Sequence, residues 1–250
     1  MIDSNTKQKH FGSMYINGRR AAPNTHYSPN DGQIAFGDTV ADRSIPWILV
    51  NDMWIAGAVY APGVTWADLN REGFILGQPI RIDGKPYLCR SLKVGVHGYE
   101  PCSDDELWHW RGRYFIGQEH IRQGKEEKCV IRGLVSPRDF NKYNVCNTNI
   151  CIGFRPVLEE LPTEPTISDE LLGSTLTVYG NGQALGGLFV DYTDYDLILA
   201  SGFDVDCPAF KGLAHKCGST RLAVNRMAIT YLSTTDNPHH PPVTKAQERS

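Results

Sequence analysis

PIRIDGKPYLCR, residues 79–90, is the most informative stretch of the chain. Apolar and polar residues alternate on both sides of Asp83-Gly84, and an Asp-Gly pair is the preferred centre of a two-residue β-hairpin. The stretch therefore predicts two antiparallel strands joined at residues 83–84. Upstream of it, residues 65–76 (TWADLNREGFIL) place Thr65 as an N-cap before spaced apolar residues, which predicts a short helix beginning there.

The composition is that of a globular protein. The chain has 250 residues, of which 41% are hydrophobic and 21% charged, enough apolar material for two domains of ordinary size. The net charge of -3 gives no basic footprint, so a dedicated nucleic-acid-coating role is not expected. No window approaches the ~18–20 apolar residues of a membrane span, and the N-terminus lacks the apolar region of a signal peptide. We therefore expect a cytoplasmic chain with no membrane partner.

Turn-forming pairs and prolines divide the chain into five expected segments. The central segment is rich in short apolar runs and holds all five tryptophans, which marks it as a first core. The tract LPTEPT that follows carries two prolines and predicts a linker. The segments are a turn-rich arm (1–44), the central domain (45–160), the linker (161–166), a second domain (167–234) and a flexible tail (235–250).

The central domain closes with IGFRPVLE, residues 152–159. This ending, preceded by the DGKxYxxR hairpin and the DLN helix, resembles C-type lectin-fold domains of phage and bacterial proteins, including tail adhesins and the variable proteins of diversity-generating retroelements. The resemblance covers residues 45–160 and implies that Phe154 lies in the core while Arg155 ties down neighbouring loops. It also implies a ligand face within residues 108–149. The candidate ligand-binding residues there are Trp108, His109, Trp110, Arg111, Arg113, Arg132, Arg138, Lys142 and Tyr143.

The second domain is predicted to be a five-stranded small barrel. Asn181-Gly182 suits a hairpin turn, and the paired glycines Gly186-Gly187 suit a bent strand. The segment resembles the Sm-like family, whose first motif is met by Gly186, Leu188, Asp196, Leu197 and Leu199, and whose second motif is met by Val224, Asn225, Arg226, Ile229 and Leu232.

The Sm-like resemblance implies a possible barrel site and a mode of assembly. The candidate residues of the barrel site are Tyr195, Asp196, Asn225 and Arg226, and Tyr195 stands in the position of a base-stacking side chain. Carboxylates nearby would repel phosphates, so nucleic-acid binding is not favoured. Sm-like barrels commonly close into rings by pairing strand edges, which makes a homo-oligomer the expected state.

No catalytic residue, metal ion or cofactor is expected from the motifs. The seven cysteines are odd in number and contain no CxxC pair, and the eight histidines contain no HExxH. P-loop, GxGxxG and GxSxG motifs are likewise missing. The lectin-like fold also houses formylglycine-generating oxidases, and in that alternative Cys146 and Cys151 would be the candidate thiols.

Together these features predict an α+β protein, in which a C-type lectin-like domain precedes a small five-stranded SH3/Sm-like β-barrel. The expected function is that of a non-enzymatic binding protein, phage or prophage encoded, with a host protein, a glycan or a small anionic ligand as its partner. Sequestration of a host defence factor or signal nucleotide is one form of that function. The alternatives are a virion or tail adhesin, an RNA-binding Sm-like protein and an oxidase of the formylglycine-generating type.

Overall fold

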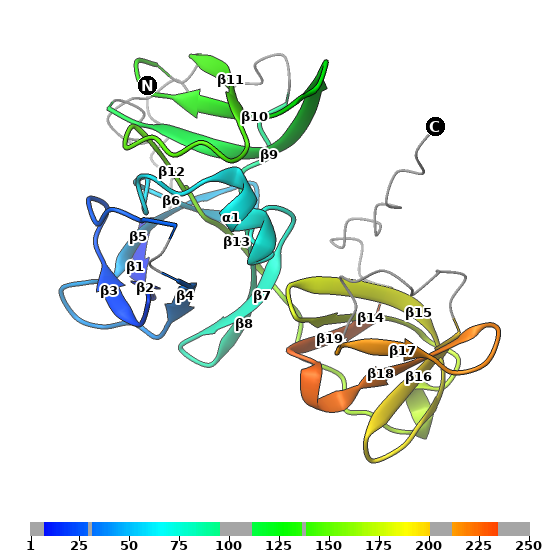
Figure 1. The fold of residues 1–250 in the computed structure, drawn as a ribbon. Coiled ribbons are helices and arrows are strands. Elements are labelled where there is room, and N and C mark those ends of the chain that lie inside the picture. The colour runs from blue at the N-terminus through cyan, green and yellow to red at the C-terminus, as the bar shows by residue number, and fades with distance from the viewer. Residues whose placement is uncertain (1–7, 30–31, 96–111, 137–138, 201–211, 235–250) are drawn as a thin grey trace. The chain divides into compact units, whose positions relative to one another are not determined.

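The computed structural model of the chain describes residues 8–29, 32–95, 112–136, 139–200 and 212–234 (Figure 1). The chain divides after Leu161 into two compact units, residues 1–161 and 162–250. The division follows the first residue of the proline-containing tract 161–166.

The described residues form a mainly-β structure, so the expectation of an α+β fold is wrong. Strands account for 52% of them and helical segments for 6%. The one α-helix of the described ranges is α1 (Trp66–Arg71), and no helix there is long and apolar enough to cross a membrane. The aromatic and β-branched runs form strands because these side chains pack well on a pleated, half-buried surface.

A six-stranded sheet organises the first unit. The hairpin predicted at residues 83–84 is confirmed, since Ile82 pairs with Lys85 and the turn residues Asp83 and Gly84 have φ of 51° and 75°. The strand order is β1 (Gln8–Phe11), β5 (Ile45–Val50), β6 (Met53–Ala56), β13 (Val157–Glu160), β8 (Lys85–Arg90) and β7 (Gln78–Ile82).

Both faces of this sheet are buried in the middle of the unit. Trp47 and Leu158 belong to the larger apolar cluster, whereas Ile48 and Val157, their neighbours in sequence, belong to a second cluster with Phe115. Successive residues of a strand point to opposite faces, so the two clusters lie on the two sides of the sheet. The other sheets of the unit are β11 (Phe140–Asn144), β10 (Glu126–Gly133), β9 (Tyr114–Gln123) and β12 (Ile152–Gly153), and β3 (Arg19–Ala21), β2 (Ser13–Ile16) and β4 (Ile34–Gly37).

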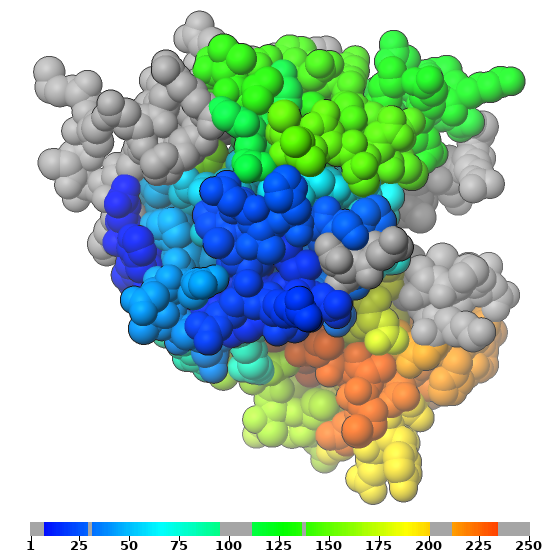
Figure 2. Space-filling model, turned by 60° about the vertical axis from the view of Figure 1, so that its left-hand side comes forward, coloured from blue at the N-terminus to red at the C-terminus, as the bar shows by residue number. Residues whose placement is uncertain are grey.

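The described residues of the first 44, which begin at Gln8, do not form an arm separate from this unit. Met14 and Ile34 are 0% and 3% exposed and pack in the same cluster as Trp47, and strand β1 pairs with β5. Figure 2 shows the dark blue N-terminal residues lying against the later residues of the unit. The boundary expected at residue 44 therefore crosses a continuous core, because turn-forming pairs mark chain reversals and not domain ends.

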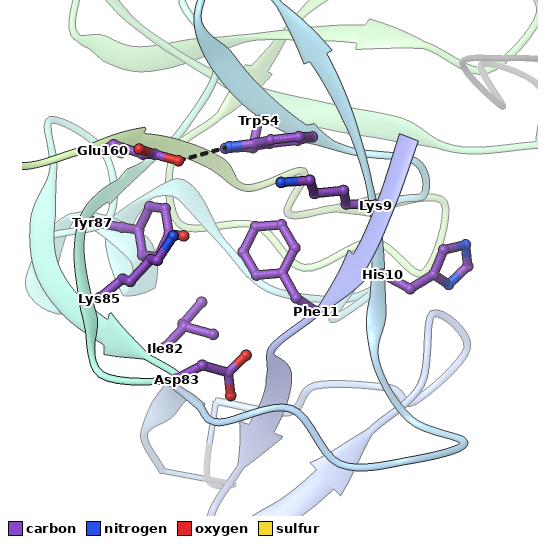
Figure 3. A pocket seen from close by; sticks show the side chains of 9 residues that line it. All are labelled: Lys9, His10, Phe11, Trp54, Ile82, Asp83, Lys85, Tyr87 and Glu160. Carbon is purple, nitrogen blue, oxygen red and sulfur yellow. Dashed lines mark hydrogen bonds between the residues drawn. The ribbon is translucent and has the colours of Figure 1, made fainter. Parts of the chain in front are cut away.

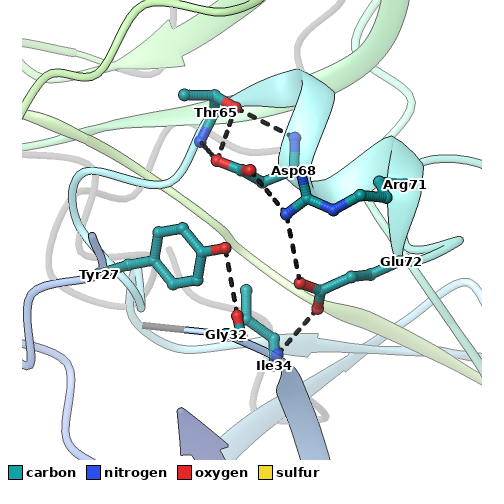
Figure 4. Close-up of polar contacts among 7 residues, drawn as sticks. All are labelled: Tyr27, Gly32, Ile34, Thr65, Asp68, Arg71 and Glu72. Carbon is teal, nitrogen blue, oxygen red and sulfur yellow. Dashed lines mark hydrogen bonds and ion pairs between the residues drawn. The ribbon is translucent and has the colours of Figure 1, made fainter. Parts of the chain in front are cut away.

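Helix α1 begins after Thr65, as the sequence predicts. The Thr65 hydroxyl accepts a hydrogen bond from Asp68 N at 3.0 Å, and the Asp68 carboxylate accepts one from Thr65 N at 3.2 Å, which is a reciprocal capping box (Figure 4). Just after the helix, the Glu72 carboxylate accepts a hydrogen bond from Ile34 N at 2.8 Å. Burial raises the pKa of Glu72. The helix thus connects the small N-terminal sheet to the rest of the unit.

Phe154 and Arg155 are architectural, as expected. Both are 0% exposed, and Arg155 Nε donates to the carbonyl oxygen of Ala56 at 2.8 Å. The guanidinium carbon also lies 5.7 Å from the centroid of the Phe115 ring. Burial lowers the pKa of Arg155 to about 9, which leaves it charged at neutral pH.

The second unit is built on another six-stranded sheet, one strand more than the predicted five. The hairpin at Asn181-Gly182 is confirmed, since Gly180 pairs with Gln183. Gly186 and Gly187 pair regularly, and the irregularity lies instead between Phe189 and Asp191. The order is β17 (Ala214–Lys216), β18 (Arg221–Asn225), β16 (Asp196–Ala200), β15 (Gln183–Tyr192), β14 (Thr175–Gly180) and β19 (Tyr231–Thr234). The 3-10 helices of the described residues of this unit are η1 (Asp169–Leu171) and η3 (Arg226–Ala228).

Candidate functional site

A cavity of about 250 Å³ opens where the two edge strands of the first unit's six-stranded sheet approach each other (Figure 3). The ring of Phe11, at the end of β1, lies 5.8 Å from the ring of Tyr87 on β8. A Cβ atom on the next residue, Gly12, would stand 3.0 Å from Ile82 on β7. We call this cavity the seam pocket. It is lined by Lys9, His10, Phe11, Trp54, Ile82, Asp83, Lys85, Tyr87 and Glu160.

Strand register explains why residues so distant in sequence face one pocket. Glu160 on β13 is directly opposite Tyr87 on β8, and Lys85 is opposite Ile82 on β7. Residues opposite each other in an antiparallel pair project from the same face of the sheet. Tyr87 and Lys85 are two residues apart on one strand, so they share that face as well. The seam pocket therefore lies on the face of the sheet that carries Lys85, Tyr87 and Glu160.

Aromatic rings form the floor of the seam pocket. The Phe11 and Trp54 ring centroids are 5.7 Å apart at an interplanar angle of 84°, an edge-to-face arrangement. Trp54 and Tyr87 are 5% and 4% exposed, while Phe11 is half-buried. Burial, followed by the nearby carboxylates of Glu160 and Asp83, raises the pKa of Tyr87. The floor is thus apolar and held in place by packing.

Charged side chains of both signs form the rim. Lys9, Lys85, Asp83 and Glu160 are all exposed. Lys9 Nζ lies 5.2 Å from the centroid of the Trp54 ring, and Trp54 Nε1 donates to Glu160 Oε1 at 3.4 Å. Hydrogen bonds from Thr39 lower the pKa of Asp83. Two lysines and two carboxylates balance in formal charge, so the rim can pair with positive or negative groups of a ligand.

Of the nine residues predicted for a lectin-like ligand face, none of the four that the structure describes lines this pocket. Arg132 is 1% exposed and donates to the Val94 carbonyl at 3.3 Å, so it cannot present its guanidinium to a ligand at the surface. Arg113 donates to the Ile150 carbonyl at 2.8 Å and so ties down that loop. Lys142 is exposed on β11, and Tyr143 is half-buried against the core. Trp108, His109, Trp110, Arg111 and Arg138 lie outside the described residues.

The residues predicted for the barrel site do lie together. Asp196 on β16 is opposite Asn225 on β18, and Arg226 N donates to the Tyr195 carbonyl at 2.9 Å. Tyr195 is 78% exposed. Met227, which follows Arg226 in η3 and is not among the predicted site residues, is 92% exposed. The apolar run from Met227 to Leu232 favours a strand in the sequence, but the structure places Met227 in η3 and begins β19 only at Tyr231.

The cysteines differ in environment. Cys146 and Cys151 are free and exposed, whereas Cys89 and Cys129 are free and buried. Burial raises the pKa of Cys129 to about 12 and that of Cys89 well above its usual value. Among the residues that the structure describes, no group of three or more His, Cys, Asp or Glu side chains could hold a metal ion.

Comparisons of the chain with protein-family models, with curated proteins and with solved structures find no match. The C-type lectin and Sm-like resemblances stay predictions. The seam pocket is therefore the feature from which a function can be argued.

Proposed function

We propose that the protein is a non-enzymatic binding protein whose ligand site is the seam pocket. The observation that carries this proposal is the combination of an aromatic floor with an exposed, charge-balanced rim in one cavity. Small-molecule sites are typically concave and largely apolar, with a few polar groups that fix the ligand's orientation. The ligand would bury an apolar part against Phe11 and Tyr87 and present polar groups to the rim.

The charges on the rim restrict the ligand. A strongly anionic ligand would be attracted by Lys9 and Lys85 but would also meet Asp83 and Glu160. The small anionic ligand expected from the sequence is therefore not what this pocket favours. A ligand with a balanced or positive charge fits the carboxylates and the negative faces of the rings better.

An NMR titration of the full chain with a library of small neutral, anionic and cationic fragments tests the proposal. Binding fragments should shift the amide signals of Lys9, Phe11 and Tyr87. A Glu160→Ala variant should weaken the binding of cationic fragments, because it removes a rim carboxylate. Glu126, an exposed glutamate of the same unit outside the pocket, provides the matched control Glu126→Ala. Fragments that shift other regions, or a library that shifts none of these amides, would overturn the proposal.

A further inference from the structure

We infer that the seam pocket accepts the ammonium group of a small organic cation, and that the Lys9 side chain is its intramolecular occupant. This inference rests on the proposed binding function and names the class of ligand.

The position of Lys9 shows what the pocket can hold. Its ammonium nitrogen lies 5.2 Å from the centroid of the Trp54 ring, within the range of a cation–π interaction. Figure 3 shows this nitrogen pointing into the pocket, between the rings of Trp54 and Phe11 in that view. Tryptophan is the best of the three aromatic side chains for this interaction. The Lys9 ammonium is thus a cation that the structure already places over the Trp54 ring.

The surroundings of that nitrogen suit a cation. The rings of Phe11, Trp54 and Tyr87 form one group, with Phe11 5.7 Å from Trp54 and 5.8 Å from Tyr87. Their faces carry the negative part of the ring quadrupole. The carboxylate of Glu160 lies beside the indole N–H, and that of Asp83 lines the same cavity. The Trp54 face under the nitrogen, the neighbouring rings and the two carboxylates are together the kind of surroundings that favour an ammonium group.

Lys9 can leave the pocket without disrupting the fold. It lies on the edge strand β1, its side chain is exposed, and its backbone pairs with Trp47 whatever the side chain does. Once its ammonium has moved out, the remaining rim charges are Lys85 against Asp83 and Glu160, a formal charge of −1 from these three side chains. The vacated pocket then attracts a cation more strongly than the occupied one.

A methylated ammonium is the form expected to displace Lys9. A lysine ammonium is compact and strongly hydrated, so it loses much hydration when it enters an aromatic site. Aromatic cages are used for quaternary ammonium groups such as those of choline and methyl-lysine, whose methyl groups also contact the rings. The cavity of about 250 Å³ has room for a small molecule of this kind.

Titration of the full chain with choline, followed by the indole N–H signal of Trp54 and the amide of Phe11, tests the inference. The matched probe is 3,3-dimethylbutan-1-ol, which has the shape of choline but a carbon in place of the charged nitrogen. Choline should shift both signals, and the neutral alcohol should bind several-fold more weakly. Lys9→Ala should tighten choline binding by about 2- to 5-fold, the range of an exposed cation–π interaction. Glu160→Gln should weaken it, and Lys125→Ala, an exposed lysine outside the pocket, should leave it unchanged.

The outcomes distinguish an error in the class of ligand from an error in the location of the site. Equal binding of choline and the neutral alcohol would overturn the role of charge but leave the seam pocket as a binding site. Failure of choline to bind, while other fragments shift the Phe11 amide, would overturn the ligand class alone. If no fragment shifts these signals in the wild type or in Lys9→Ala, the inference and the proposed function both fail.

Discussion

Thr39 donates two hydrogen bonds to the carboxylate of Asp83, 44 residues away in the chain. The backbone N–H of Thr39 reaches Asp83 Oδ1 at 2.8 Å, and its hydroxyl donates to Asp83 Oδ2. The same hydroxyl oxygen accepts a hydrogen bond from Gly12 N at 2.8 Å. Gly12 directly follows strand β1, and Asp83 lies in the β7–β8 turn. Thr39 therefore links the two sides of the seam pocket.

Removing this link should weaken the first unit. Thr39→Val loses the hydroxyl but keeps the backbone donor, and Asp83→Asn loses the charge of the acceptor. We expect each change to lower the free energy of unfolding by about 0.5–1.5 kcal/mol per lost hydrogen bond, with solvent exposure favouring the lower end. Urea unfolding followed by tryptophan fluorescence measures this, since all five tryptophans lie in the first unit. Asp42→Asn, at another exposed aspartate, should change little.

The same link predicts a pH dependence. Hydrogen bonds from Thr39 lower the pKa of Asp83 in the folded chain below its value in the unfolded chain. The stabilisation is then complete above the unfolded pKa of about 3.9 and is lost as the pH falls through the folded pKa. Urea midpoints measured from pH 6 down to pH 3 should fall more for the wild type than for Asp83→Asn. Parallel pH profiles for the two proteins would show that the carboxylate carries no such stabilisation.

The capping box of α1 predicts a second loss of stability. Thr65 is 5% exposed, and its hydroxyl caps α1. Glu72, directly after this helix, accepts a hydrogen bond from Ile34 N. Thr65→Ala should destabilise the first unit by about 0.5–2 kcal/mol, the usual cost of losing an N-cap. Thr65→Ser keeps the hydroxyl and should recover most of that loss in the same urea experiment. Equal destabilisation by Ala and Ser would mean that the Thr65 methyl group, and not the cap, is what matters.

Local features could be predicted from the sequence, whereas the seam pocket could not. The turns at Asp83-Gly84 and Asn181-Gly182 and the helix start at Thr65 depend on residues a few positions apart, and all three are confirmed. The pocket depends on long-range pairing: Glu160 reaches Trp54, 106 positions earlier, because β13 inserts between β6 and β8. No spacing rule predicts such an insertion.

Two assumptions about segments of the chain also kept the pocket residues from being predicted. Lys9 and Phe11 fell in a stretch interpreted as an arm, although β1 pairs with β5 inside the core unit. The lectin-like resemblance directed attention to residues 108–149, where Arg132 proves to be buried. The alternation of residues 79–90 did contain a usable signal, since Ile82, Lys85 and Tyr87 share one face of the predicted hairpin.

Gly180 predicts a steric effect in the second unit. A Cβ atom at this position would stand 2.2 Å from the carbonyl oxygen of Ala228 and 2.6 Å from Leu213 Cδ1. Gly180→Ala must therefore displace η3 or the buried Leu213 side chain, and we expect a loss of about 1–3 kcal/mol. Thermal unfolding measured by calorimetry should show a lower transition for this unit. Ser219→Ala, at an exposed position of the same unit, should stay within about 0.5 kcal/mol of the wild type. An unchanged transition in Gly180→Ala would mean that η3 is not held rigidly against β14.

The edges of the second sheet bear on the homo-oligomer expected from the sequence. Ring closure by strand pairing needs open edges, and at one edge β18 is covered by the three-residue strand β17. At the other edge, the Leu232 N–H of β19 donates to Glu164 Oε1 at 3.1 Å, and the Tyr231 hydroxyl donates to the Pro162 carbonyl at 2.6 Å. A carboxylate that accepts from an edge N–H takes the place that a second strand would use.

Self-association through β19 should therefore require the removal of Glu164. We expect Glu164→Ala to increase concentration-dependent self-association in sedimentation velocity runs, because the Leu232 N–H then lacks this acceptor. Glu170→Ala, an exposed glutamate of η1 in the same unit, is the matched control and should behave as the wild type. A discrete oligomer already formed by the wild type and insensitive to Glu164→Ala would show instead that copies associate through a surface other than this strand edge.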